Sequence, residues 1–243
     1  MFFYSDSYVL YWFLGLILLP GFLFGLWAQF KVSATYKKYA TIKTENEVTA
    51  SSLTRTLLDG GDLSYITVSK VSGELTDHYD IRSENIALSS GVYDSASISA
   101  LGIAAHEVGH AFQKRDNYLP MKIRNALIPI TNFASRMLVP LMIIGLLLNV
   151  FIFTGGILGD IFILSGIAFF GLSILLSFIT LPIEYNASHR ALKALKLSSG
   201  LTASEIRGAR KVLSAAAMTY VAALLIAILS FVRFLLAVLL SRK

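Results

Sequence analysis

The stretch IFILSGIAFFGLSILLSFITLPIEY, Ile161 to Tyr185, runs for 23 residues without a charge before it reaches Glu184. A helix needs roughly 20 predominantly apolar residues to cross about 30 Å of hydrocarbon. Three further uncharged runs are of similar length, at residues 7–30, 137–159 and 212–232. We therefore predict four transmembrane helices, at residues 7–30, 126–154, 160–183 and 212–240.

The composition agrees with a membrane protein. Of the 243 residues 55% are hydrophobic and 15% are charged, and the mean hydropathy is +0.66. The first span has an acidic flank at Asp6, a long apolar run and no A-x-A cleavage site after it, so we expect a retained anchor rather than a secretory signal. The chain has no cysteine, and any bound metal must therefore use His, Asp or Glu.

Positive charge is concentrated in two polar segments. Of the 21 Lys and Arg, 11 lie between the first two spans and six between the last two, whereas the turn Thr154 to Asp160 has none. Because cytoplasmic segments carry the excess of Lys and Arg, residues 31–125 and 184–211 are predicted to face the cytoplasm. The tail Ser241 to Lys243 would then lie outside, against this rule, so its orientation stays open. We expect the net charge of +6 to favour anionic lipid, and we expect no nucleic-acid partner.

The first polar segment predicts one compact α+β unit inserted between spans. An amphipathic helix is expected at about Thr49 to Leu58 and ends at a glycine pair. Three short β-prone runs follow, at Tyr65 to Val71, within GELTDHYDI, and at Asn85 to Ser90. A helix should then begin at good cap residues, Asp94 to Ser97, and run to about Gln113. The fold class is therefore a mainly α membrane protein with a small cytoplasmic α+β unit.

This last helix contains AAHEVGHAF, Ala104 to Phe112. His106 and His110 are four residues apart, so both imidazoles can face one ion from the same side of the helix. A catalytic zinc has three protein ligands and an open position for water, and Glu107 can accept a proton from that water. The alternative is a helix that carries two histidines and a solvated glutamate without a metal.

A third ligand is required, and the candidates are Glu184, His189, His78, Asp77 and Asp80. Glu184 is favoured because it stands at the end of the third span. The small residues that follow it, Ala187, Ser188 and Ala191, would allow this helix to approach the His helix closely, with Gly109 opposite. His189 is five residues from Glu184 and so lies on another face.

Four stretches of the chain resemble the bacterial membrane zinc metallopeptidases of the YugP type: GELTDHYD, VYDSASISALGIAAHEVGHAFQ, LPIEYNASHRAL and ARKVLSAAAMTYVAAL. More distantly they resemble the HtpX and Ste24 membrane peptidases, whose third zinc ligand is a glutamate in an E-x-x-x-D segment. The resemblance implies that Glu184 is the third ligand. Ser188 stands where the distant relatives carry Asp, and Asn186 and His189 stand where the closer family is expected to carry Asp and Arg.

The resemblance also implies a zincin-like (gluzincin-type) catalytic unit, in which the edge of a strand holds the substrate peptide. We expect NIALSS, Asn85 to Ser90, to be that edge strand. An oxyanion donor is also needed, with His78, Tyr185 and Arg190 as candidates. Because zinc-bound histidines usually donate their second N–H to a carboxylate, Asp77 and Asp80 are candidates for orienting an imidazole.

The sequence therefore predicts a zinc-dependent metalloendopeptidase in the bacterial cytoplasmic membrane, with its active site facing the cytoplasm. His106, His110 and Glu184 would bind Zn²⁺, and Glu107 would be the catalytic base. Its substrates would be membrane proteins or peptide segments close to the bilayer. The alternative is a non-catalytic membrane scaffold or partner of a quality-control complex. A membrane protein partner is compatible with either reading, and the oligomeric state stays open.

Overall fold

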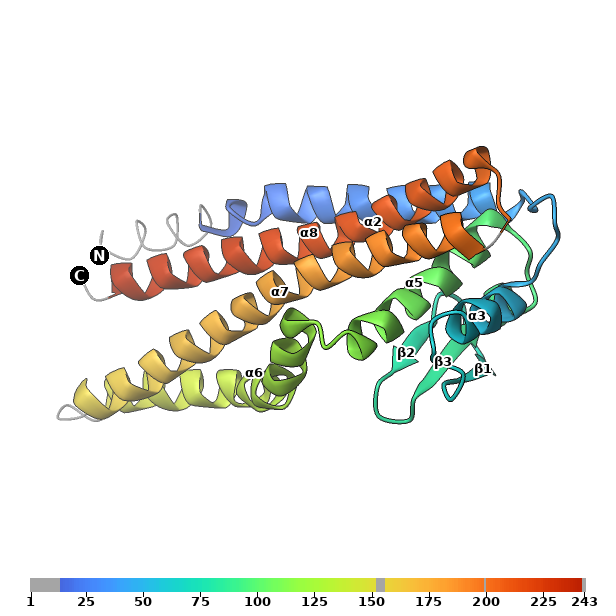
Figure 1. Cartoon of the computed structure of the whole chain (residues 1–243). Helices are drawn as coiled ribbons and strands as arrows, with labels where there is room; N and C mark the ends of the chain where they lie inside the picture. Colours follow the sequence, from blue (N-terminus) through green and yellow to red (C-terminus); the bar gives the residue numbers. More distant parts are fainter. Residues whose placement is uncertain (1–13, 152–155, 199, 242–243) are drawn as a thin grey trace. The chain divides into compact units, whose positions relative to one another are not determined.

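The computed structural model describes residues 14–151, 156–198 and 200–241. Its long helices are α2 (Leu19–Ala40), α6 (Leu119–Phe151), α7 (Gly156–Ser198) and α8 (Ala203–Ser241) (Figure 1). Within these described ranges, four helical stretches are long and apolar enough to cross a membrane: Leu14–Ala40, Leu119–Gly145, Ile157–Leu197 and Ala203–Leu236. The structure thus agrees with the predicted number of spans.

The long helices extend past the uncharged runs. Helix α7 includes Pro182 and continues for 15 residues beyond Ile183, because the following segment is rich in Ala, Leu and Lys, which favour a helix. The turn expected at Thr154 to Asp160 is shorter than predicted, because residues 156–160 already belong to α7, which begins at Gly156. Thr154 and Gly155 lie outside the described residues. Uncharged runs therefore locate spans but not the ends of their helices.

The chain divides into two compact units, of which one comprises residues 1–26, 122–180 and 220–243. Glycines allow close helix contacts in the described part of this unit. A Cβ at Gly21 of α2 would lie 2.9 Å from Leu229 of α8, and one at Gly166 of α7 would lie 2.8 Å from Met142 of α6. Small residues at helix contacts are typical of membrane bundles, where close van der Waals packing replaces the hydrophobic effect.

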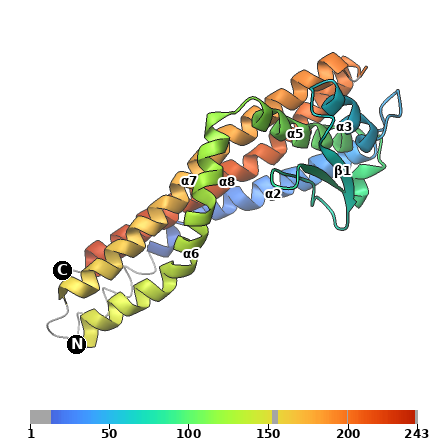
Figure 2. The same cartoon turned by 60° about the horizontal axis from the view of Figure 1, so that its bottom comes forward.

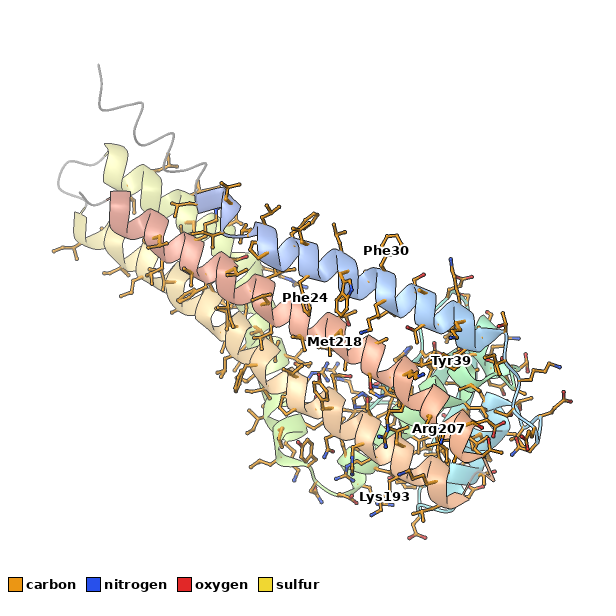
Figure 3. The ribbon with its side chains drawn as sticks, turned by 90° about the horizontal axis from the view of Figure 1, so that it is seen from above. Phe24, Phe30, Tyr39, Lys193, Arg207 and Met218 are labelled. Atoms are coloured by element: carbon orange, nitrogen blue, oxygen red, sulfur yellow. The ribbon has the colours of Figure 1, made fainter. Side chains whose placement is uncertain are left out.

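The other unit comprises residues 27–121 and 181–219. It contains α3 (Ala50–Asp59), a three-stranded sheet, α4 (Ser90–Tyr93) and α5 (Ile98–Arg115), together with parts of α2, α7 and α8 (Figure 2). Its hydrophobic core is contributed by these helices and the sheet, and includes Leu57, Leu58, Ile86, Leu88, Leu101, Val108, Leu195 and Leu213. On the outer side of α2, Phe30 projects away from α8 and is 80% exposed (Figure 3).

Local capping explains where the helices of this unit begin. Thr49 caps α3 by accepting a hydrogen bond from Ser52 N, and Ser97 caps α5 by accepting one from Ala100 N. Gly60 follows the last residue of α3. The helices predicted at about Thr49 to Leu58 and from Asp94–Ser97 to Gln113 are therefore observed within a few residues of the expected ends.

The sheet contains β1 (Thr67–Val71), β2 (His78–Asp80) and β3 (Asn85–Ser89) in the order β1-β3-β2. Strand β3 pairs parallel to β1 and antiparallel to β2. The expectation that NIALSS forms an edge strand is therefore wrong: β3 is central. The physical reason is visible in its burial, since Ile86, Ala87 and Leu88 are all 1% exposed or less. Strands covered on both faces carry continuous apolar runs.

Candidate metal centre

Helix α5 presents both histidines of the motif on one side. Their ring centroids are 4.7 Å apart and their planes are nearly perpendicular, at 85°. Their side chains are mostly buried, with exposed fractions of 17% for His106 and 12% for His110. The spacing of four residues therefore places two nitrogen donors next to each other in a sheltered position, as predicted from the sequence.

Glu184 reaches both rings from α7. Its Oε2 lies 3.2 Å from His106 Nε2 and 3.6 Å from His110 Nε2. One ligand atom from each of the three residues lies within 4.8 Å of the others. With zinc bonds of about 2.0–2.2 Å, the ligands of a tetrahedral site are about 3.3 Å apart. The donor set, two imidazoles and one carboxylate, and its spacing therefore fit zinc.

The close approach of α5 and α7 makes this reach possible (Figure 2). A Cβ at Gly109 would lie only 2.4 Å from the backbone oxygen of Ala187 and 3.0 Å from its carbonyl carbon. Ala187 and Ala191 are fully buried in the contact. The small residues singled out in the sequence do lie where the two helices meet, and they allow a short side chain such as Glu184 to span the distance.

Glu107 is 8% exposed and follows His106 directly on α5. Its carboxylate has no hydrogen-bond partner among the residues that the structure describes. The charge of Glu107 acts on the imidazole ring of His110. Burial lowers the pKa of His110, but the hydrogen bond with Glu184 and the charge of Glu107 outweigh that effect and raise the pKa above its usual value. The surroundings therefore favour a positive charge at this position.

The second nitrogen of each ring contacts a neutral polar side chain. Ser188 Oγ lies 3.1 Å from His106 Nδ1, and Gln113 Oε1 lies 3.0 Å from His110 Nδ1. A hydroxyl and an amide therefore lie where carboxylates were predicted. Gln113 was not among the sequence candidates, although a polar residue three positions after His110 on a mostly apolar helix is a signal for such a role.

The two aspartates proposed to orient an imidazole are occupied elsewhere, so that expectation is corrected. Asp77 accepts hydrogen bonds from the backbone N–H and the hydroxyl of Ser89, which tie the β2 end to β3. Asp80 accepts from Arg82 N and Ser83 Oγ in the turn after β2. Asp80 thus bonds its own turn, as short polar side chains readily do, and Asp77 is held by Ser89 of the neighbouring strand.

The remaining candidates do not join the three-residue cluster. His78 is exposed, and its Nδ1 lies 2.8 Å from the backbone oxygen of Thr76. Tyr185 is 45% exposed. Arg190 forms an ion pair with Asp116 and donates a hydrogen bond to Asn186, so its guanidinium group already has partners. His189 lines a cavity of about 480 Å³ together with Arg190.

The chain is similar to known proteins over most of its length. The family described as "Putative neutral zinc metallopeptidase" matches residues 14–239. The chain is 39% identical over 209 residues to "Putative membrane protease YugP" of Bacillus subtilis (strain 168), an alignment that covers 86% of this chain and 88% of that protein. No solved structure matches it. A family match over nearly the whole chain, and a relative this similar, show that the chain belongs to this zinc metallopeptidase family.

Proposed function

We propose that the protein is a membrane-embedded zinc metalloendopeptidase in which His106, His110 and Glu184 hold the metal. The observation that carries the proposal is the convergence of these three side chains, from two helices, with their ligand atoms within 4.8 Å of one another. The family supports the same metal and the same class of reaction. A bound zinc would polarise the scissile carbonyl and lower the pKa of a bound water.

Glu107 is the proposed general base and acid. It is buried beside His106, it is held on the same rigid helix, and its carboxylate has no competing hydrogen bond among the described residues. It can therefore take the proton from the attacking water and pass it to the departing amine. Side chains in such a role contribute about 10²–10⁴-fold to the rate.

The peptide substrate is proposed to bind along β2 rather than β3. Among the described strands β2 pairs only with β3, so its other edge has backbone groups available for an added strand. Strand β2 packs beside α5, whereas β1 packs beside α3 and α4. Lys114 of α5 donates to the backbone oxygen of Ile81, directly after β2, and so anchors this edge to the helix of the site.

The charge distribution supports a site on the cytoplasmic side of the membrane. The segments that carry most Lys and Arg are those that contribute α5 and the end of α7. Glu184 follows the uncharged run of α7 directly, which supports a site near the lipid surface. We therefore propose substrates that are membrane proteins or segments emerging from the bilayer.

The proposal is tested with purified protein and unfolded, membrane-tethered peptides. Glu107→Gln should keep zinc but lose at least about 10²-fold in cleavage rate. Glu205→Gln is the matched control, because Glu205 is equally buried but lies at the start of α8 and bonds Thr202 and the backbone of Glu45. This control should cleave at nearly the wild-type rate. Equal cleavage by Glu107→Gln and wild type rejects the mechanism.

Metal analysis separates the peptidase from a non-catalytic membrane scaffold. The peptidase requires about one zinc per chain that is lost in Glu184→Ala. A chain that binds no zinc at neutral pH, and cleaves nothing, would be a scaffold.

A further inference from the structure

Gln113 is a fully buried amide in the contact between α5 and α7. It follows His110 by three residues, so both side chains lie on the same side of α5. Its Oε1 is 3.0 Å from His110 Nδ1, while its Nε2 donates to the backbone oxygen of Ile183 at 2.8 Å and to Asn186 Oδ1 at 3.0 Å. One side chain thus joins a ligand on α5 to residues on both sides of Glu184 on α7.

These partners determine which way the amide faces. A backbone carbonyl can only accept a hydrogen bond, so the atom that faces Ile183 must be the NH₂ group of Gln113. The oxygen of Gln113 therefore faces His110. Because this oxygen is also only an acceptor, His110 Nδ1 must carry a hydrogen, and in the neutral ring that binds a metal the lone pair of Nε2 is then directed to the side of Glu184.

We propose that Gln113 is a positioning residue of the metal centre. It sets the tautomer and ring orientation of His110, and it holds that ring in register with Glu184. The inference rests on the proposed function, and it adds a residue whose effect on the metal is exerted entirely through a ligand.

The ion pair between Arg190 and Asp116 stabilises Asn186, the hydrogen-bond partner of this amide. Asn186 Oδ1 also accepts a hydrogen bond from Arg190 Nε at 2.7 Å, and Arg190 is paired with Asp116, the residue that caps the C-terminal end of α5. Asn186 is therefore held as an acceptor by two donors at once. These contacts run from Gln113 of α5, through Asn186 and Arg190 of α7, to Asp116 at the C-terminal end of α5. They restrain the contact between the two helices next to the metal ligands.

A leucine in place of Gln113 would fill a similar volume but would leave the His110 N–H and the Asn186 oxygen without this partner in a buried place. The ring would then be free to rotate or to change tautomer. Loss of a group that orients a metal-bound histidine typically costs 10–100-fold in metal affinity.

Zinc affinity, measured by competition with a chelator on the full chain in detergent, tests the proposal. Gln113→Leu should bind zinc about 10–100-fold more weakly than wild type. Thr54→Val is the matched control: Thr54 is fully buried in α3 and donates to Ala50, away from the site. It should bind zinc as wild type does. If Gln113→Leu stays within twofold of wild type, the proposal is overturned.

A second pair of variants decides the case if Gln113→Leu fails to fold. Asn186→Asp keeps an oxygen that accepts from Gln113 and Arg190, whereas Asn186→Leu removes it. We expect Asn186→Asp to bind zinc clearly more tightly than Asn186→Leu. Equal affinities would overturn the proposal.

Nitrogen NMR of the zinc-loaded chain reads the tautomer directly, and is tractable because the chain has only four histidines. The hydrogen of His110 is expected on Nδ1 in wild type. A hydrogen on Nε2 would overturn the proposal. Wild type that binds no zinc would overturn the proposed function as well, whereas tight binding by both wild type and Gln113→Leu would overturn only the role of Gln113.

Discussion

Replacing Gly109 with alanine tests the helix contact on which the site depends. The new Cβ would lie 2.4 Å from the backbone oxygen of Ala187 and 3.2 Å from its Cα. Both are backbone atoms, so no side-chain rotation can relieve the clash. To bring the closest pair to an ordinary contact of 3.4 Å, α5 and α7 must move apart locally by about 1 Å.

That movement would affect metal binding more than folding. Overpacking costs about 1–3 kcal/mol, and the gain of up to about 1 kcal/mol from removing a helical glycine partly offsets it. Zinc–ligand bonds are only about 2.0–2.2 Å long, so a displacement of about 1 Å between Glu184 and the histidines is half a bond length. We expect zinc affinity to fall at least about tenfold, and cleavage to fall by about 10²-fold.

Chelator competition for zinc and peptide cleavage by purified protein measure these two effects. Gly102→Ala on the same helix is the control, because its Cβ would meet Ala209 at 3.4 Å, which is an ordinary contact. It should bind zinc normally and should be equally or slightly more stable. Wild-type zinc affinity in Gly109→Ala would show that the contact with Ala187 does not set the ligand geometry.

Three further changes have defined outcomes. Removing zinc with a chelator should lower the melting temperature of wild type, since a ligand that binds only the folded state adds about 2.7 kcal/mol at 100 times its Kd, and Glu184→Gln should show no such response. Tyr79→Phe should be neutral or stabilising by up to about 1 kcal/mol in detergent melting experiments, because the buried hydroxyl of Tyr79 has no hydrogen-bond partner among the residues that the structure describes; a clear loss of stability would reveal a partner. The hydrogen bonds from Arg115 and then Arg190 lower the pKa of Asp116, so the stability it contributes is present above the unfolded pKa of about 3.9 and is lost as the pH falls through the lower folded value. Asp116→Asn should therefore melt below wild type at pH 7, with the difference shrinking below about pH 4, and a constant difference across that range would contradict the assignment.

Local signals account for the parts of the structure that the sequence predicts well. The positions of His106, Glu107 and His110 follow from the period of one helix, and the spans follow from uncharged runs. Glu184 is 74 positions beyond His110, yet its neighbours Ala187 and Ala191 indicate a close helix contact even at that separation.

Features that depend on competition between distant groups are less predictable. The central place of β3 is decided by how three short strands pair, and its only sign in the sequence is the short apolar run of Ile86, Ala87 and Leu88. Asp77 has the right chemistry to orient an imidazole, but both of its oxygens accept hydrogen bonds from Ser89. Gln113, by contrast, lies on α5 on the same side as His110, and its Oε1 contacts the Nδ1 of that ring.

The packing around the site indicates why a metal explains it better than an ion pair does. Two carboxylates, Glu107 and Glu184, are buried close enough to His110 to act on its charge, and the helices that carry them meet at Gly109 and Ala187, two small residues. Buried ion pairs rarely repay the cost of removing their charges from water, and small residues bury less apolar surface than large ones. The contact therefore gives up stability twice, once in desolvation and once in packing. A divalent cation between the three ligands would offset the cost of desolvation. The small residues, which cost packing, would let Glu184 come within a bond length of that cation.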